Sequence, residues 1–265
     1  MRVEDSISAP AIDPRKKRFG RLIERNDGRD VPFYDGSPVE VATWKWLLII
    51  ASCVVGFAAL IFLPQETNVL ALLPRFLFVA IPMAVFIGLT GPFWKSIFYK
   101  PTGADYRDMV IFWLLNLAVS FVVGLIVSSI FGANANKATD GVLERGPGEV
   151  VAFYVGTGIQ LLGEEVFTIL PLLAVMYWLY TKARLNRTTS MLLAWLITAI
   201  WFGAAHLPTY GWNVAQSLLV IGTARIVLTL AFLRTKNILV STGAHILNDW
   251  VTFSLVLVAA ATAGI

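Results

Sequence analysis

Long apolar stretches alternate with short polar segments along most of this chain. Seven of the stretches come close to the roughly 20 residues that an α-helix needs to cross a bilayer. We place these predicted helices at 44–63, 69–90, 109–131, 150–180, 190–207, 213–233 and 237–261. Aromatic residues typical of a membrane interface lie near their ends, at Trp44, Trp46, Trp94, Tyr99, Trp178, Tyr180, Tyr210 and Trp212. The pattern predicts an all-α, polytopic membrane bundle.

The fourth stretch, 150–180, is long for a single crossing. It contains residues at which a membrane helix can hinge or break, namely Gly156, Gly158, Gly163 and Pro171. A bundle of eight spans is therefore the alternative to seven.

Charged residues in the loops predict the orientation. If the N-terminus is cytoplasmic, the inner loops contain Lys95, Lys100, Arg107, Lys182, Arg184, Arg187, Arg234 and Lys236. The outer loops then contain Glu66, Lys137, Asp140, Glu144, Arg145 and Glu149. Positive charge gathers on the inner side, as the positive-inside rule requires, so we expect the N-terminus inside and the C-terminus outside.

Composition supports the membrane class. The 265 residues are 57% apolar and 14% charged, whereas about 25% of a soluble domain is charged. The single cysteine, Cys53, excludes an intrachain disulfide. We interpret 1–42 as a polar, solvated, cytoplasmic tail without a signal peptide, and 43–265 as the transmembrane domain. The net charge of +4 follows from this topology, so nucleic acid is not needed as a partner.

Two adjacent acids, Glu164 and Glu165, stand inside the fourth apolar stretch. A carboxylate in hydrocarbon costs at least ~2.5 kcal/mol, so it is a candidate for a functional site. Successive residues of a helix point about 100° apart. One glutamate can therefore act on water while the other braces the site, and a structural ion pair inside the bundle is the alternative.

The only two histidines of the chain also lie in apolar stretches. Phe202 precedes His206 by four residues, and Asp249 follows His245 by four. Each pair therefore shares one face of a helix, and Asn248 is close enough in angle to His245 to line the same site. Together with the glutamates, these residues look like the functional groups of a hydrolase.

Arg225 is predicted near the middle of the sixth helix. An arginine at that depth needs a carboxylate partner or water. The acids at comparable depth are Glu164, Glu165 and Asp249.

Glu164-Glu165, Phe202-xxx-His206 and His245-xxx-Asp249 resemble, in this order, three motifs of a known family. This is the CAAX-protease and bacteriocin-processing family of intramembrane peptidases, the CAAX-type Abi family. Its pattern is Glu-Glu-xxx-Arg, Phe-xxx-His and His-xxx-Asn or His-xxx-Asp, and the resemblance covers roughly 150–255. One departure is that Ile169 stands where the family has arginine. We expect Arg225 to replace that arginine from another helix; otherwise the site is weakened or inactive.

The resemblance implies roles for these residues. Glu164 would activate the water that attacks a peptide carbonyl, and His206 would help to hold that water or a metal. His245 and Asp249 would stabilise the oxyanion or complete the polar shell, and Glu165 would support them. Further supporting residues would be Phe202, Arg225 and Asn248.

Zn²⁺ or another divalent metal is a possible cofactor, with Glu164, His206 and His245 as ligands. The chain has no His-Glu-xx-His spacing, so these ligands would have to converge from three helices. A metal-free mechanism, in which histidine stabilises the oxyanion, fits the same residues. Both alternatives stay open.

Three functions are compatible with this pattern. The first is an intramembrane endopeptidase that acts on a membrane-associated peptide or protein within the lipid bilayer. The second is a catalytically degenerate relative that scaffolds a membrane partner, for which Ile169 is the main argument. The third is a small proton-coupled transporter. By resemblance, we expect a bacterial plasma membrane protein, in a family associated with peptide maturation and bacteriocin immunity.

The predicted depths of the site residues do not agree for straight helices. His206 lies near the outer end of its helix, whereas His245 is about 8 residues, or ~12 Å, from the inner end of its own. Either the fifth helix ends below the outer surface and 207–212 dips into the bundle, or the helix boundaries differ from those predicted.

Overall fold

The structure is a computed structural model that describes residues 14–144 and 146–263, and every regular element within these ranges is a helix. The α-helices are α1 (Thr43–Phe62), α2 (Leu72–Thr90), α3 (Gly103–Phe131), α4 (Pro147–Tyr177), α5 (Arg187–Ala205), α6 (Gly222–Thr235) and α7 (Ile238–Ala263). Shorter helical turns are η1 (Pro14–Lys16), η2 (Gly91–Ile97), η3 (Lys137–Thr139), η4 (Trp178–Lys182) and η5 (Gln216–Ile221). With their adjoining turns, 7 helices of the described chain are long and apolar enough to cross a membrane. The predicted all-α membrane bundle is confirmed.

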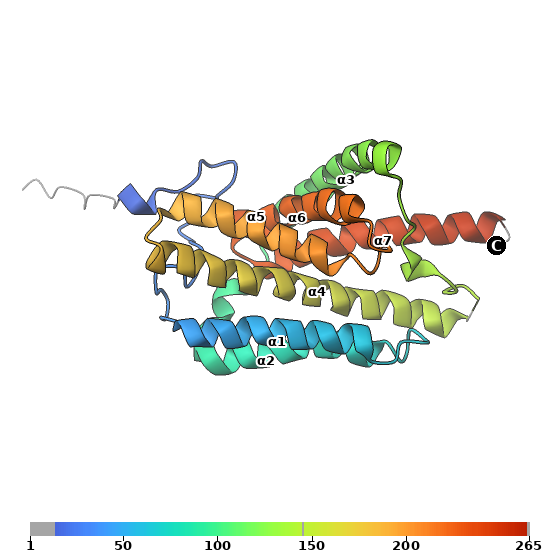
Figure 1. The fold of residues 1–265 in the computed structure, drawn as a ribbon, viewed down its shortest axis with the longest axis horizontal. Coiled ribbons are helices and arrows are strands. Elements are labelled where there is room, and N and C mark those ends of the chain that lie inside the picture. Colours follow the sequence, from blue (N-terminus) through green and yellow to red (C-terminus); the bar gives the residue numbers. More distant parts are fainter. Residues whose placement is uncertain (1–13, 145, 264–265) are drawn as a thin grey trace, which may run out of the picture.

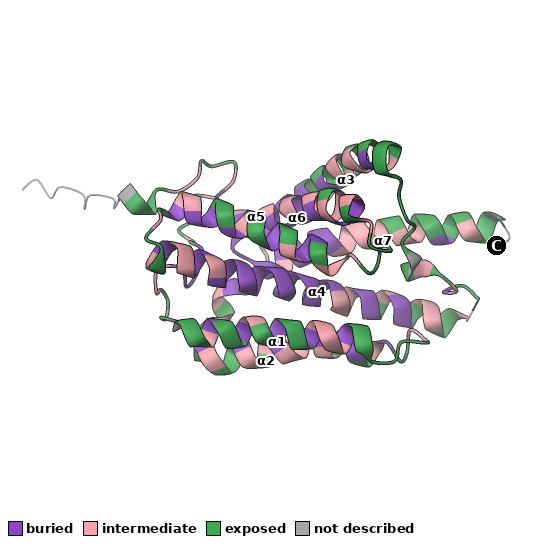
Figure 2. Ribbon diagram, in the orientation of Figure 1, coloured by how far each residue is buried: buried purple, intermediate pink, exposed green. Residues whose placement is uncertain are grey.

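Helix α4 runs through the middle of the bundle (Figure 1) and is the most continuously buried helix (Figure 2). Helices α1 and α2 cover one side of it, and α5, α6 and α7 lie on the other side. The helix is continuous, so the alternative of an eighth span is wrong. Gly163 allows α2 to approach closely, because an added Cβ would lie 2.5 Å from the Phe78 ring.

Of the predicted tail 1–42, residues 1–13 lie outside the described part of the chain, and the rest is in part buried rather than solvated. Its apolar side chains Val31, Phe33 and Tyr34 are buried, and the segment covers one end of the bundle (Figure 1). The Phe33 ring packs edge-on against Trp46 of α1, with ring centroids 6.0 Å apart. Burial of these side chains makes the segment part of the folded domain.

Ion pairs fasten this segment to the ends of several helices. The buried carboxylate of Glu24 accepts hydrogen bonds from Arg187 at 2.8 and 2.5 Å and from Lys236 at 2.8 Å. Burial acts to raise the pKa of Glu24, but the bonds from both cations outweigh it and lower this pKa to about 2. Arg25 pairs with Asp105 of α3 at 2.6 Å. The contacts tie α3, α5 and the α6–α7 turn together.

These contacts place 15–42 at the same end as the basic residues predicted for the inner loops. Arg187, Arg234 and Lys236 all bind groups of the segment. The grouping agrees with the predicted topology, and the side of the membrane that this end faces stays a prediction.

Candidate active site

A buried ion pair joins α4 and α6 at the centre of the bundle. Arg225 Nη2 lies 2.6 Å from Glu165 Oε1, and both side chains are 0% exposed. Because a buried arginine cannot lose its proton, it needs such a carboxylate. The guanidinium also lies over the Phe202 ring, 5.0 Å from its centroid. The partner predicted for Arg225 from the sequence is therefore present.

The same carboxylate orients His245 of α7. His245 Nδ1 lies 3.0 Å from Glu165 Oε1, and since an ionised carboxylate only accepts, Nδ1 carries the proton. The other nitrogen, Nε2, faces Glu164 Oε2 at 3.7 Å and Asp249 Oδ1 at 3.9 Å. Both distances are too long for a direct hydrogen bond and suit a bridging water.

The two adjacent glutamates have different surroundings. Glu165 is enclosed and braced by Arg225, whereas the Glu164 side chain is 11% exposed. Gln160, one turn earlier on α4, donates to Glu164 Oε1 at 3.0 Å. Glu164 thus keeps its second oxygen facing His245 and available to a reactant.

His206 stands at the C-terminal cap of α5. Its Nδ1 lies 2.8 Å from the Phe202 carbonyl oxygen, which can only accept, so Nδ1 donates and Nε2 is left unprotonated in the neutral ring. The Phe202 ring lies near both histidines, with its centroid 4.5 Å from that of the His206 ring and 6.4 Å from that of the His245 ring. His206 therefore borders the cluster through Phe202, without a direct hydrogen bond to its carboxylates among the described residues.

Asp249 is more open than Glu164 and His245, with a side chain 25% exposed against 11% and 6%. Asn248 donates to its Oδ1 at 3.0 Å and accepts a hydrogen bond from Asn116 of α3, also at 3.0 Å. Asn248 thus connects the third motif to α3.

The expected metal ligands do not come together as one group in the structure. No three His, Cys, Asp or Glu side chains within the described ranges are placed so that they could hold an ion. The Nδ1 atoms of His206 and His245 are bound within the protein, which leaves Nε2 as the atom that each histidine could offer to a metal. A metal cofactor therefore stays a prediction.

Tyr210, which the sequence analysis assigned to the membrane interface, follows His206 by four residues and is influenced by the charges of the cluster. It is buried in the turn after α5, where its N–H donates to the His206 carbonyl at 3.3 Å. Burial raises the pKa of its hydroxyl, and the negative charges of Asp249 and Glu164 add to this, giving a pKa of about 12. The hydroxyl therefore stays a neutral donor near these carboxylates, and its spacing of four residues from His206 was the available signal.

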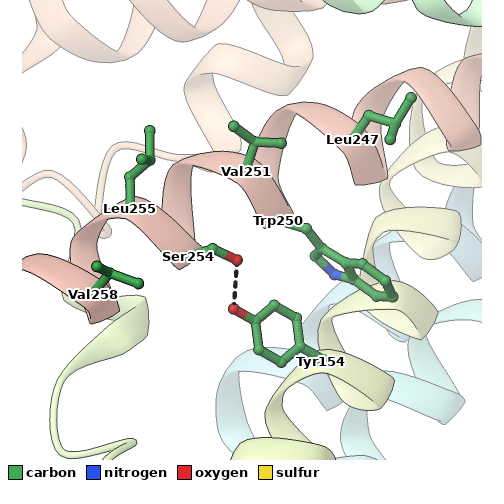
Figure 3. Close-up of a pocket in the computed structure, with 7 residues that line it drawn as sticks. All are labelled: Tyr154, Leu247, Trp250, Val251, Ser254, Leu255 and Val258. Atoms are coloured by element: carbon green, nitrogen blue, oxygen red, sulfur yellow. Dashed lines mark hydrogen bonds between the residues drawn. The ribbon is translucent and has the colours of Figure 1, made fainter. Parts of the chain in front are cut away.

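An apolar cavity of about 410 Å³ lies on a neighbouring face of α7 (Figure 3). Its lining residues are Tyr154, Leu247, Trp250, Val251, Ser254, Leu255 and Val258. The polar atoms of Tyr154 and Ser254 bind each other at 2.7 Å, so the lining offers no free group for hydrolysis. The candidate chemistry lies in the cluster around Glu164.

The fold and this cluster define an integral membrane helical protein with carboxylates and imidazole gathered inside the bundle. Residues 146–251 match the family model described as "Type II CAAX prenyl endopeptidase Rce1-like". The match includes all three motifs and confirms the recognition of the CAAX-protease and bacteriocin-processing family in this region. Neither a curated protein nor a solved structure matches the chain.

Proposed function

We propose that the protein is an intramembrane endopeptidase of the CAAX type, which hydrolyses a membrane-associated peptide or protein with a glutamate-activated water. The observation that carries this proposal is the connected series Arg225–Glu165–His245, whose free end, His245 Nε2, faces Glu164. The family match supports the reaction class.

In this proposal the reactive water lies between Glu164 Oε2 and His245 Nε2, which are 3.7 Å apart. Glu165 holds the Nδ1 proton of His245, as the buried aspartate does in a serine-protease triad, so neutral Nε2 is an acceptor. A water between Nε2 and Glu164 Oε2 donates one hydrogen to each, which leaves an oxygen lone pair for the peptide carbonyl. Glu164 takes the proton as the water attacks, and returns it to the leaving nitrogen when the C–N bond breaks.

The negative charge that develops on the carbonyl oxygen needs a donor. The neutral Tyr210 hydroxyl meets this need without carrying a charge into the bilayer. His206 Nε2, unprotonated in the neutral ring, accepts from water and helps to order the outer side of the site.

Ile169 is the main argument for a degenerate site. That argument becomes weaker because Arg225 pairs with Glu165 and supplies the cation that position 169 lacks. No specific observation favours a scaffold or a transporter over the peptidase.

The test is cleavage of a lipid-anchored peptide by the purified, reconstituted protein. Glu164→Gln should reduce the rate by about 10²–10⁴-fold, the range for loss of a general base. Glu144→Gln, in an exposed loop, is the matched control and should cleave like the wild type. Equal activity of Glu164→Gln and the control would contradict the proposal.

A further inference from the structure

Two arginines and two large apolar side chains form an exposed patch where α3 begins. Arg21 and Leu22 belong to the turn that starts at Gly20, and Leu22 is 90% exposed. Tyr106 and Arg107 lie in the first turns of α3, where Tyr106 is 57% exposed and the Arg107 side chain is 65% exposed. We call Arg21, Leu22, Tyr106 and Arg107 the α3 patch. Cations beside exposed apolar groups suit a partner that is both charged and apolar.

Arg234 of α6 holds the two parts of the α3 patch next to each other. Its Nη1 donates to the carbonyl oxygens of Arg21 and Leu22, in both cases at 2.8 Å. Its Nε donates to Asp108 of α3 at 2.6 Å, and Asp108 in turn lies 3.5 Å from Arg107 Nη2. The turn and the start of α3 are therefore joined through Arg234 and Asp108.

The surface of the α3 patch is positively charged, because the acids around it are buried and paired. The side chains of Glu24, Asp105 and Asp108 are at most 1% exposed. Glu24 binds Arg187, Asp105 binds Arg25, and Asp108 binds both Arg25 and Arg234. These acids are therefore largely neutralised by other cations. The charges of the two patch arginines face outward.

The length of α3 places the patch at the level of the lipid headgroups. The helix has 29 residues, which is ~44 Å at 1.5 Å per residue. The hydrocarbon core of a bilayer is only ~30 Å thick, and an average tilt of about 20° shortens the length that α3 spans only to ~41 Å. The first turns of α3 therefore stand in the polar layer, where phosphate groups lie.

We propose that the α3 patch binds the headgroup of an anionic phospholipid, with phosphatidylglycerol as the probe. Arg21 and Arg107 bind the phosphate, since a guanidinium offers two parallel N–H donors to phosphate oxygens. Leu22 and Tyr106 reach the boundary between the headgroups and the acyl chains. The same turn contains Glu24, which binds Lys236 before α7. A bound lipid therefore also holds the N-terminal segment on the bundle.

The first experiment measures lipid binding to the detergent-solubilised protein by native mass spectrometry. Phosphatidylglycerol and phosphatidylcholine with the same acyl chains are compared. The double variant Arg21→Gln, Arg107→Gln should weaken the first phosphatidylglycerol binding event about 25-fold, roughly fivefold per arginine, and leave phosphatidylcholine binding unchanged. The matched control is Lys95→Gln, Arg184→Gln, which removes two exposed cations from other loops and should bind phosphatidylglycerol like the wild type.

Thermal unfolding gives a second readout that separates lipid binding from a structural role. Phosphatidylglycerol should raise the unfolding temperature of the wild type and the control more than phosphatidylcholine does, because a ligand of the folded state stabilises it. The double arginine variant should lose this gain. Without added lipid it should unfold at the wild-type temperature, since both side chains are exposed. An equal loss with and without phosphatidylglycerol would show that the arginines are structural and would overturn the proposal.

Other outcomes would also overturn it. Equal binding of the two lipids by the wild type would remove the anionic preference. An equal loss of binding in the control would assign the effect to the general positive charge of this end. A stabilisation by soluble glycerol phosphate as large as that by phosphatidylglycerol would show a soluble-phosphate site, and binding of an acidic peptide without a lipid preference would show a protein partner. None of these measurements needs peptide cleavage, so they stand apart from the proposed function.

Discussion

The buried Arg225–Glu165 pair offers a test of how the site is held together. The two side chains are 0% exposed and 2.6 Å apart. Arg225→Met keeps much of the side-chain volume but leaves Glu165 buried without its cation, which typically costs about 3–5 kcal/mol. In a chain of this size 1 kcal/mol shifts the unfolding temperature by ~2–4 °C. We expect a decrease on the order of 10 °C for Arg225→Met.

The double variant Glu165→Gln, Arg225→Met separates stability from activity. It removes both buried charges, and neutral side chains of similar size often replace a buried pair at little cost. Most of the unfolding temperature should therefore return. Cleavage should not return, because the neutral amide no longer fixes the Nδ1 proton of His245 as a carboxylate does.

The assay combines thermal unfolding of the detergent-solubilised protein with cleavage by the reconstituted protein. The reasoning is refuted if Arg225→Met costs less than about 1 kcal/mol, well below the loss of about 3–5 kcal/mol that is typical of a broken buried pair. It is also refuted if the losses of the two single variants simply add in the double variant. Ile169→Arg, four residues after Glu165 on α4, should recover part of the loss caused by Arg225→Met, because it returns a cation to the same helix face.

Three further outcomes are expected. Tyr210→Phe should lower kcat by at least about tenfold through loss of an oxyanion donor, without a change in unfolding temperature; an unchanged kcat would remove Tyr210 from the mechanism. Glu24→Gln should cost about 3 kcal/mol at pH 7, because the pKa of Glu24 is lowered from 4.5 to about 2 by folding. That stabilisation is fully present above pH 4.5 and is lost as the pH falls towards 2, so unfolding curves of the wild type and the variant should converge in acid; a gap that persists at pH 2–3 would contradict this cause. Gly163→Ala should cost about 1–3 kcal/mol in thermal unfolding, because its Cβ would meet the Phe78 ring at 2.5 Å; a variant as stable as the wild type would show that α2 can shift.

The sequence predicts the spans and the Arg225 pairing for the same physical reason. In a bilayer, a helix that is too short to cross and a charged side chain without a partner both cost free energy. Arg225, in the middle of its helix, had three candidate acids at comparable depth. Its partner is Glu165, the acid that lacks the arginine of the family motif because Ile169 stands at that position. These constraints leave few alternatives, so the local sequence is sufficient to predict the spans and the Arg225 pairing.

The burial of 15–42 could not be predicted in this way. Val31, Phe33 and Tyr34 belong to one short apolar run, 31–34, which is too short to show helical or strand periodicity. Their burial depends on contacts with distant helices, such as that of Phe33 with Trp46, and Glu24 depends on Arg187 and Lys236 from distant parts of the chain. The burial of Tyr210 could not be predicted for a related reason, because a tyrosine after a helix end has the same local pattern whether it is exposed or buried.

The position of the α6–α7 turn explains why the predicted depths of the site residues disagreed. Lys236 and Asn237 in this turn are 1% and 0% exposed, and Glu24 of the N-terminal segment binds the Lys236 ammonium. Helix α7 therefore begins inside the protein, beneath 15–42, and Figure 1 shows it starting partway along α4 and extending beyond it at the opposite end. A start at this height brings His245 beside Glu165 after only two turns of α7. The Glu24 contacts hold this turn in place. The segment 15–42, which the sequence predicts as a tail, therefore helps to fix the position along α4 at which His245 lies beside Glu165.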